Sequence, residues 1–570
     1  MIKKLADYQY ERVDFDAFKL AFDQNLSAFN TASTVAEAKT ALDALIEQQA
    51  LFDSQFNLYS IRFSLNMDDP FYKAEDDYWN EAGPKFAELD NQFNKALTNS
   101  PLKAELQAFY PATFFKLAEQ AVKTFDESII ELAQAENKLS TQYNELIGSA
   151  QIPFNGETLT LPQINKFVSD ADRTVRQAAS SAVTNWYTKH EATFDAIYDQ
   201  MVQNRHAQAL ALGYKDYVEL SYDRRQRIGY DRTDVETYRA QVLKYVVPVA
   251  TKFYQRQQTR LGYDTMHYYD WPLEFLDGNP KPKGSTAEKV ALGQQMYREL
   301  SPETGEFFDF MVEHDLLNLD SHKGKQSGGY ATVILNELSP FIFANYNGTS
   351  GDVDVLTHEA GHAFQAYESM KSIKAPTIVW PTIEAAEIFS MSMEFIAWPW
   401  MEQFFGDATA KYKYAHLLHA LQFLPYGVLV DHFQQVVYEN PTMTPAKRKA
   451  TWRELEQMYL PHKQYGEDAP LLERGGFWYR QGHIFDVPFY YIDYTLAQVV
   501  AFQFWQRFEI EGDKAAAWAD YLTAAKAGGT QSFLEIIEQT HLQNPLVAGA
   551  LQDSIAKIDA YLSNIAEVDL

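Results

Sequence analysis

The sequence predicts a mainly α-helical protein with two lobes and one small β-sheet. Residues 1–200 carry long stretches with apolar side chains three and four residues apart, as in 42–52 and 117–146, and this spacing is typical of amphipathic helices. Strand-like runs are confined to residues 330–335 and 341–346, which flank a polar turn and predict a hairpin. A chain of 570 residues exceeds the size at which one hydrophobic core stops growing, so we expect two lobes.

Composition excludes several kinds of protein. The net charge of −28 argues against a nucleic-acid partner, because phosphate binding requires basic patches. The chain contains no cysteine, so any metal must be held by His, Asp or Glu. Asp7 lies where a signal peptide needs its apolar segment, and the sequence has no run of 18 or more uncharged apolar residues. We therefore expect a cytoplasmic protein that does not contact membranes.

One segment carries a metal-binding pattern. His358 and His362 are four residues apart, so on a helix both imidazoles project from one face and can bind one Zn²⁺. Glu359 then lies beside the metal, where it can take a proton from an activated water as general base. The alternative is a coincidental pattern on an ordinary helix, and a third protein ligand would decide between the two.

The spacing rules out several positions for that third ligand. Zinc peptidases with a third histidine need Gly three and His six residues after the second ligand, where this chain has Gln365 and Glu368. Classes with Glu 19 or 20 residues after the second ligand would find Pro381 or Thr382 here. Neither of these two residue types binds zinc.

Three glutamates further along remain as candidates. Glu384, Glu387 and Glu394 share one face of a helix that Pro381 can begin. A solvated acidic stripe is the ordinary interpretation of such a helix. However, three carboxylates among apolar neighbours such as Phe389 would be costly in a core unless a cation compensates them. The pattern therefore favours a metal site.

The combined pattern resembles the oligoendopeptidase F and thimet-oligopeptidase family of zinc metallopeptidases, and in particular its Pz-peptidase-like bacterial branch. That family has His-Glu-x-x-His and then a ligand Glu 25 residues after the second His, which opens the frame Glu-x-x-Ser-x-x-x-Glu. Glu387, Ser390 and Glu394 match this frame. The resemblance implies that Glu387 is the third ligand and that Glu394 orients one of the ligand histidines.

A second block, residues 475–494, resembles the family pattern in which a histidine and following tyrosines face the zinc across a cleft. The matching residues are His483, Tyr490, Tyr491 and Tyr494. The resemblance implies catalytic roles for His483, Tyr491 and Tyr494 at the oxyanion of the tetrahedral intermediate, and contact of Tyr490 with the substrate. The thimet branch spaces its His and tyrosines differently by about one residue, so the identity of the oxyanion donor among the three tyrosines stays open. Alone, such a tyrosine cluster would indicate core packing.

A third match precedes the predicted hairpin. Gly328, Gly329 and Tyr330 resemble a glycine-containing segment that lies against the substrate backbone in the family. The resemblance as a whole implies a two-lobed helical zincin with a deep central channel and a small sheet beside the active-site helix. The lobes would be an N-terminal one over residues 1–195 and a catalytic domain over 196–570, with one zinc ion per chain. The expected activity is hydrolysis of internal bonds in short unstructured oligopeptides.

Two other functions stay open. A related helical zinc carboxypeptidase would need a cationic clamp for the substrate carboxylate, and Arg480 is a candidate for that clamp. A non-catalytic helical protein that binds peptides is disfavoured, because binding alone would not require Glu359.

Overall fold

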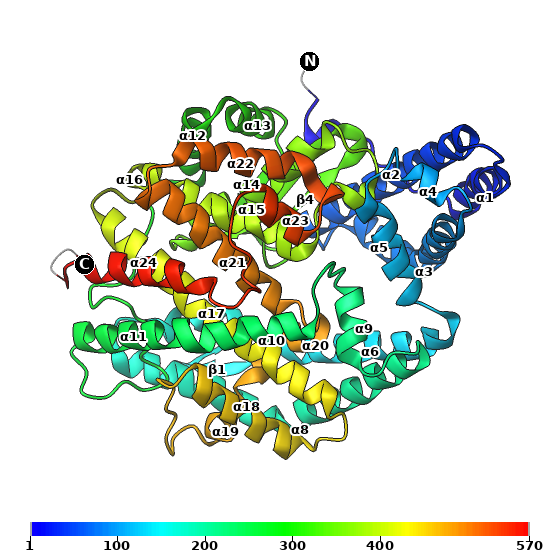
Figure 1. Cartoon of the computed structure of the whole chain (residues 1–570). Coiled ribbons are helices and arrows are strands. Elements are labelled where there is room, and N and C mark those ends of the chain that lie inside the picture. Colours follow the sequence, from blue (N-terminus) through cyan, green and yellow to red (C-terminus); the bar gives the residue numbers. More distant parts are fainter. Residues whose placement is uncertain (1–2, 568–569) are drawn as a thin grey trace. The chain divides into compact units, whose positions relative to one another are not determined.

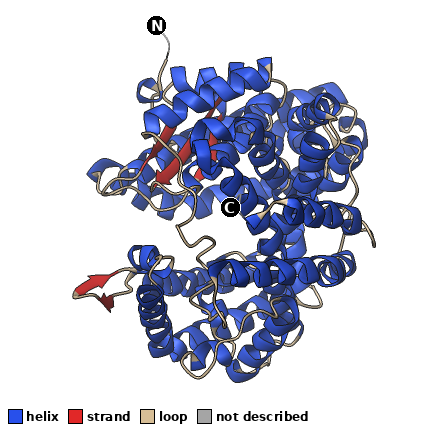
Figure 2. Cartoon of the chain, turned by 90° about the vertical axis from the view of Figure 1, so that its left-hand side faces the viewer, coloured by secondary structure: helices blue, strands red, loops and turns tan. Residues whose placement is uncertain are grey.

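The computed structural model describes residues 3–567 and residue 570. Helices make up 71% of the structure, which confirms the predicted mainly α-helical class. Figure 2 shows the strands as two small groups among helices. None of the described helices combines the length and the apolar character needed to cross a membrane.

The chain divides into two compact units, each built from three separate segments. Unit 1 comprises Met1–Lys123, Lys281–Thr409 and Val500–Asn544, and unit 2 comprises Thr124–Pro280, Ala410–Val499 and Pro545–Leu570. The boundary between an N-terminal lobe and a catalytic domain at residue 195 stays a prediction.

Unit 1 contains the N-terminal helices, the larger sheet and the helices around it (Figure 1). Its elements are α1 (Phe15–Thr31), α2 (Val35–Leu65), α3 (Pro70–Asn99), α4 (Lys103–Leu106), α5 (Ala112–Lys123), α12 (Thr286–Leu300), α13 (Pro302–Glu313), β3 (Leu317–Asp320), β4 (Tyr330–Ile334), β5 (Ser339–Tyr346), α14 (Gly351–Met370), α15 (Ile383–Ile396), α16 (Met401–Phe405), α22 (Lys514–Ala527) and α23 (Phe533–Gln539).

Unit 2 is built mainly on long helices. Its elements are α6 (Ile130–Gly148), β1 (Ile152–Phe154), β2 (Glu157–Leu159), α7 (Leu161–Val168), α8 (Arg173–Ala211), α9 (Tyr217–Arg224), α10 (Arg232–Gln241), α11 (Val247–Leu261), most of α17 (Thr409–Glu439), α18 (Pro445–Tyr459), α19 (Pro470–Glu473), α20 (Gly482–Asp486), the first part of α21 (Tyr491–Trp505) and α24 (Leu551–Asn564).

Many helix starts follow local chemistry. Thr34 accepts a hydrogen bond from the backbone N–H of Glu37, whose carboxylate accepts one from the backbone N–H of Thr34. Ser285 and Glu288 form the same reciprocal cap at the start of α12. Such caps satisfy backbone donors that a helix start leaves free, so they fix where these helices begin.

The predicted hairpin is confirmed. β4 pairs antiparallel with β5 from Tyr330↔Phe343 to Ile334↔Ser339. β3 adds to the other side of β5 in parallel, which gives the strand order β3-β5-β4 and leaves β4 at an edge of this sheet. Sequence analysis missed β3, and it also missed the separate β1–β2 hairpin of unit 2. The latter turns at Asn155 and Gly156, both with positive φ, and Asn-Gly is the strongest short hairpin signal.

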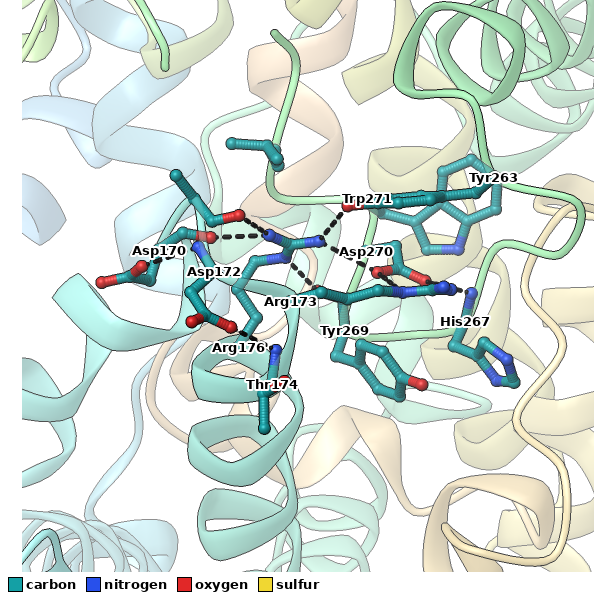
Figure 3. Close-up of polar contacts among 12 residues, drawn as sticks. Asp170, Asp172, Arg173, Thr174, Arg176, Tyr263, His267, Tyr269, Asp270 and Trp271 are labelled. Atoms are coloured by element: carbon teal, nitrogen blue, oxygen red, sulfur yellow. Dashed lines mark hydrogen bonds and ion pairs between the residues drawn. The ribbon is translucent and has the colours of Figure 1, made fainter. Parts of the chain in front are cut away.

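A buried ion-pair network fixes the start of α8 to the loop that follows α11, within unit 2. Figure 3 shows Arg173 and Arg176 converging on Asp270. Arg173 binds both carboxylate oxygens, at 3.0 and 2.7 Å, and the fully buried Arg176 binds one of them at 3.1 Å. Burial alone would raise the pKa of Asp270, but the hydrogen bonds donated by Arg173 and Arg176 lower it. The loop is therefore held by charge-assisted bonds rather than by apolar packing alone.

We expect Asp270→Asn to lower the free energy of unfolding by about 3–5 kcal/mol, because the buried Arg176 loses its counter-charge. The exposed Asp264→Asn on the same loop is the control. Urea titration would measure both. Because folding lowers the pKa of Asp270, its stabilisation is present above the unfolded pKa of about 3.9 and is lost as pH falls through the folded value. Equal stability of the two variants at pH 7 would contradict the assigned role.

Candidate functional site

The three residues predicted to bind metal lie together in unit 1. His358 and His362 project from α14, and Glu387 projects from α15. Oε2 of Glu387 lies 3.4 Å from Nε2 of His358 and 3.3 Å from Nε2 of His362. One ligand atom from each of the three residues fits within 4.8 Å of the others. Two ligand atoms about 2.1 Å from a tetrahedral zinc lie about 3.4 Å apart, so the donor set fits such an ion.

Gly361 permits the helix contact that creates this cluster. A Cβ atom at this position would lie 2.4 Å from the carbonyl oxygen of Phe389 and 2.7 Å from Cα of Ser390. Both neighbours are backbone atoms of α15, so no side-chain movement would relieve the overlap. Only glycine therefore allows α14 and α15 to approach closely enough for Glu387 to meet the two histidines.

Neighbouring side chains orient the candidate ligands. The hydroxyl of Ser390 donates to Oε2 of Glu387 at 2.9 Å. Nδ1 of His358 lies 2.7 Å from Oε1 of Glu394, as the family resemblance implies. Burial alone would lower the pKa of His358, but its hydrogen bonds to Glu387 and Glu394 raise it well above the usual range. Metal binding would require loss of the Nε2 proton, and a His358 that still donates from Nδ1 to Glu394 then presents its Nε2 lone pair to the cluster.

Glu359 is buried beside the three candidate ligands without binding them. Its side chain is 8% exposed, and its Oε2 has no hydrogen-bond partner among the described residues. Burial raises the pKa of this carboxyl group. A buried oxygen without a partner is costly, so this position calls for a water or a substrate group to fill it.

The glycine segment reaches the same carboxylate. A Cβ on Gly329 would lie in van der Waals contact with Oε1 of Glu359, at 3.5 Å, so glycine keeps the space beside this carboxylate open. Gly328 has a φ of +98°, which favours glycine. Tyr330 points elsewhere, because its hydroxyl lies 2.6 Å from Oγ of Ser64 and its ring stacks on Phe343.

The predicted histidine and tyrosine cluster lies in unit 2. The ring centroid of His483 is 5.7 Å from Tyr490, 4.9 Å from Tyr491 and 6.1 Å from Tyr494. All four side chains are partly exposed. Burial raises the pKa of Tyr491 to about 12, and its hydroxyl has no hydrogen-bond partner within the described part of the chain. The structure thus gathers these residues, while their approach to the candidate ligands of unit 1 stays a prediction.

Gln481 fixes the orientation of His483. Nε2 of Gln481 lies 2.7 Å from Nδ1 of His483, and Oε1 of Gln481 accepts a hydrogen bond from the hydroxyl of Tyr426 at 2.7 Å. Because Tyr426 donates to the amide oxygen, the amide nitrogen donates to Nδ1 and the proton of the neutral imidazole resides on Nε2. Burial lowers the pKa of His483, which favours this neutral form.

The turn between His483 and the tyrosines is strained and firmly held. Phe489 has a φ of +63°, which is rare for a bulky residue. Its N–H donates to Gln434 at 3.0 Å, and its carbonyl accepts from Arg227 at 2.6 Å. Arg227 also pairs with the buried Asp493 on α21 at 3.0 Å. These bonds determine where the first turn of α21 places its tyrosines.

Comparison with known proteins identifies the family. Models for the peptidase M3 N-terminal domain and for peptidase family M3 match residues 5–125 and 167–555, respectively. The chain belongs to peptidase family M3. It is therefore a metallopeptidase, and the resemblance drawn from the sequence is confirmed.

Relatives of this M3 peptidase match it over most of its length. An oligoendopeptidase F homolog of Borreliella burgdorferi is 22% identical over 440 residues, which cover 72% of this chain and 70% of that protein. An X-ray structure of a protein provisionally named oligoendopeptidase F has 47% identity and a TM-score of 0.93 and covers 100% of both chains. PZ peptidase A, solved with an inhibitor, has 46% identity and a TM-score of 0.93 over 99% of this chain and 100% of its own.

Sequence analysis missed several residues that position the site. Gly361 could have been noticed, because glycine inside a helix is unfavourable and usually has a packing reason. Gln481 gives no comparable signal, since its role depends on Tyr426, which lies 55 residues away. Glu368, the carboxylate that spacing excluded, pairs with Lys371 at 2.7 Å.

We expect Glu387→Gln to lose most of its bound metal, because a neutral amide is a poor ligand and only two histidines remain. Glu368→Gln on α14 is the matched control and should keep its metal. Elemental analysis after dialysis measures both. Metal loss in the control but not in Glu387→Gln would mean that the wrong carboxylate has been identified.

Proposed function

We propose that this M3 peptidase is a zinc-dependent endopeptidase that hydrolyses internal bonds of short unstructured oligopeptides. The single observation that carries the proposal is the unpartnered, buried Oε2 of Glu359 beside the three-donor cluster. His358, His362 and Glu387 would hold one zinc ion. Two imidazole nitrogens and one carboxylate oxygen leave one position of a tetrahedral zinc open, as catalytic sites require.

Zinc, when bound, supplies Lewis acidity that polarises the scissile carbonyl and lowers the pKa of water. Glu359 takes the proton of the attacking water at Oε2 and returns it to the leaving amine. Its Oε2 has no hydrogen-bond partner among the described residues, so this oxygen is available for the exchange. Glu394 holds His358 in the orientation that presents Nε2 to the metal.

Unit 2 would supply donors to the oxyanion. Gln481 leaves the proton of His483 on Nε2, so this nitrogen can donate to developing negative charge. Tyr491 suits the same role, since the residue is partly exposed and its hydroxyl has no hydrogen-bond partner among the described residues. Tyr494 lies 5.8 Å from Tyr491 by ring centroid and is the second candidate, while Tyr490 would contact the substrate.

The substrate backbone would lie along the segment 328–330. Gly329 leaves room beside Glu359, a Cβ on Gly328 would meet open space, and β4 is the edge strand of its sheet. An extended peptide can pair with such an edge. Asn57 already donates to the carbonyl of Val333 at 3.0 Å, so pairing would be confined to the start of β4. In this proposal a deep channel admits extended peptides in the cytoplasm. The oligoendopeptidase names of the relatives support cleavage of oligopeptides.

Cleavage of peptides of increasing length, followed by mass spectrometry, tests the proposal. We expect internal cleavage of short peptides by the zinc-loaded enzyme and no cleavage of native globular proteins. Glu359→Gln should keep its zinc but lose at least about 10²–10⁴-fold in kcat, because proton transfer is lost.

Three results would contradict the proposed activity. Removal of single C-terminal residues would favour a carboxypeptidase. Efficient internal cleavage of intact casein, a large flexible substrate, would indicate a general endoprotease. Near-normal turnover by zinc-loaded Glu359→Gln would refute the role assigned to this residue.

Gln481→Leu should lower kcat about tenfold or more with little change in KM, because His483 loses the bond that selects its tautomer. Gln464→Leu, which removes an exposed amide of unit 2, should have no effect. ¹⁵N NMR of the histidine side chains gives a second readout, since the Nε2–H tautomer of His483 should be depleted in Gln481→Leu. An unchanged tautomer together with unchanged kcat would mean that Gln481 does not position His483.

A further inference from the structure

Unit 2 contains two adjoining cavities whose walls share two cationic side chains. The larger cavity has a volume of about 640 Å³ and the smaller one about 220 Å³. The residues that line both are Asn165, Val183, Lys463, Phe477 and Arg480. We call the two cavities together the basic pocket. A volume of this size is typical of sites that bind small molecules or peptide segments.

The two cations contact the same aromatic ring. Nζ of Lys463 lies 3.8 Å from the ring centroid of Phe477, and Cζ of Arg480 lies 4.3 Å from it. Arg480 also lies 5.3 Å from the ring of Tyr187. An aromatic ring attracts a cation through its quadrupole, but it offers no hydrogen-bond acceptor to the N–H groups. The donors of both side chains therefore remain available to a ligand.

No carboxylate neutralises this pair within the described part of the chain. Neither cavity is lined by Asp or Glu, although the chain has 77 acidic and 49 basic residues. Glu456 acts on Lys463 electrostatically, but its own oxygens bind Tyr465 at 2.6 Å and Arg453 at 3.2 Å. Burial lowers the pKa of Lys463 to about 8. An anion bound in the pocket would therefore offset part of the free-energy cost of desolvating the charged Lys463.

The remaining walls are apolar, with a few amides. The larger cavity adds Ile147, Leu161, Pro162, Tyr187, Tyr254, Gln422, Tyr426, Leu460 and Gln481. The smaller cavity adds aromatic residues that include Tyr268 and Trp271. Asp270, bound by Arg173 and Arg176, holds the loop that carries these two residues (Figure 3). Apolar surface with scattered amides suits a peptide with a large side chain rather than a small inorganic anion.

The basic pocket is also continuous with the candidate catalytic cluster of unit 2. Tyr426 and Gln481 line the larger cavity, and Gln481 is the residue that contacts Nδ1 of His483 at 2.7 Å. One wall of the pocket is thus one hydrogen bond away from His483. A ligand in this pocket would lie next to the residues that we assign to the oxyanion.

We propose that the basic pocket binds a carboxylate of the peptide substrate through Lys463 and Arg480. The aromatic walls of the pocket would then surround an apolar side chain of the peptide next to that carboxylate. This inference rests on the proposed function, because it takes the ligand to be a peptide substrate. The carboxylate can be the C-terminal group of the peptide or an acidic side chain near that end. Both present the same anion to the two cations, so the experiment separates them.

Calorimetry with short apolar peptides measures binding without turnover when the protein carries Glu359→Gln, and the pocket variants are made in the same background. Three peptides of one sequence would be compared: a free C-terminal acid, its carboxamide, and a carboxamide with Glu as the last residue. Because charge-assisted hydrogen bonds are strong, we expect the protein with an intact pocket to bind the acid about tenfold or more tightly than the amide. Arg480→Gln and Lys463→Met should each abolish most of this preference and leave amide binding unchanged. Lys215→Gln, an exposed cation of unit 2, is the control for loss of charge.

The outcomes separate this inference from the proposed function. The inference is supported if the protein binds the acid more tightly than the amide and Arg480→Gln removes this preference. If the Glu-containing amide also binds more tightly than the plain amide, and Arg480→Gln removes that preference too, an acidic side chain is a second source of the carboxylate. Equal affinity for all three peptides, or a preference that both variants keep, would overturn the inference. Cleavage of longer peptides by the active enzyme is measured separately. Turnover without a carboxylate preference would refute only the role of the basic pocket, whereas carboxylate binding without turnover would refute only the proposed peptidase activity. Arg480 is exposed, so its variant tests the pocket even if Lys463→Met fails to fold.

Discussion

The candidate metal centre depends on one backbone contact, the approach of α14 to α15 at Gly361. A side chain there would collide with the carbonyl of Phe389 and with Cα of Ser390. Moving α15 outward to relieve the collision would carry Glu387 away from both histidines, since Glu387 lies within one turn of the contact. The same carbonyl of Phe389 also accepts a hydrogen bond from the hydroxyl of Tyr521 on α22, at 2.9 Å, which fixes this point of α15 beside Gly361. Separation of α14 and α15 at this contact would therefore break up the three-donor cluster.

The sequence predicts the residues that take part in local patterns. The spacing of His358 and His362 requires only that the segment be helical, and the frame from Glu387 to Glu394 requires only a second helix. The hairpin of β4 and β5 is likewise a short-range pattern. The tertiary partners of these elements cannot be predicted in this way, because the number of residues between two contacting segments does not indicate that they meet. β3 joins β5 in parallel, and Gln481 meets Tyr426 across 55 positions.

Unit 2 keeps most of its buried cations in pairs. Arg176 binds Asp270, Arg227 binds Asp493, and Arg239 binds Asp431. In each pair the partners lie far apart in sequence, so the ion pair ties distant segments together at the cost of desolvating both charges. Lys463, which is partly buried, and Arg480, which is exposed, have no such carboxylate partner among the described residues. Both instead lie against the aromatic ring of Phe477, in a protein with a net charge of −28.

The bond between Gln481 and His483 suits a site next to two cations. A carboxylate at position 481 would favour a charged imidazolium, because an opposite charge raises the pKa of histidine. That second positive centre would repel Lys463 and Arg480, or it would attract the substrate carboxylate away from them. An amide cannot ionise, so Gln481 selects the Nε2–H tautomer and leaves His483 neutral. In the proposed mechanism the neutral imidazole then donates a hydrogen bond to the developing oxyanion, while Lys463 and Arg480 keep the positive charge in the basic pocket.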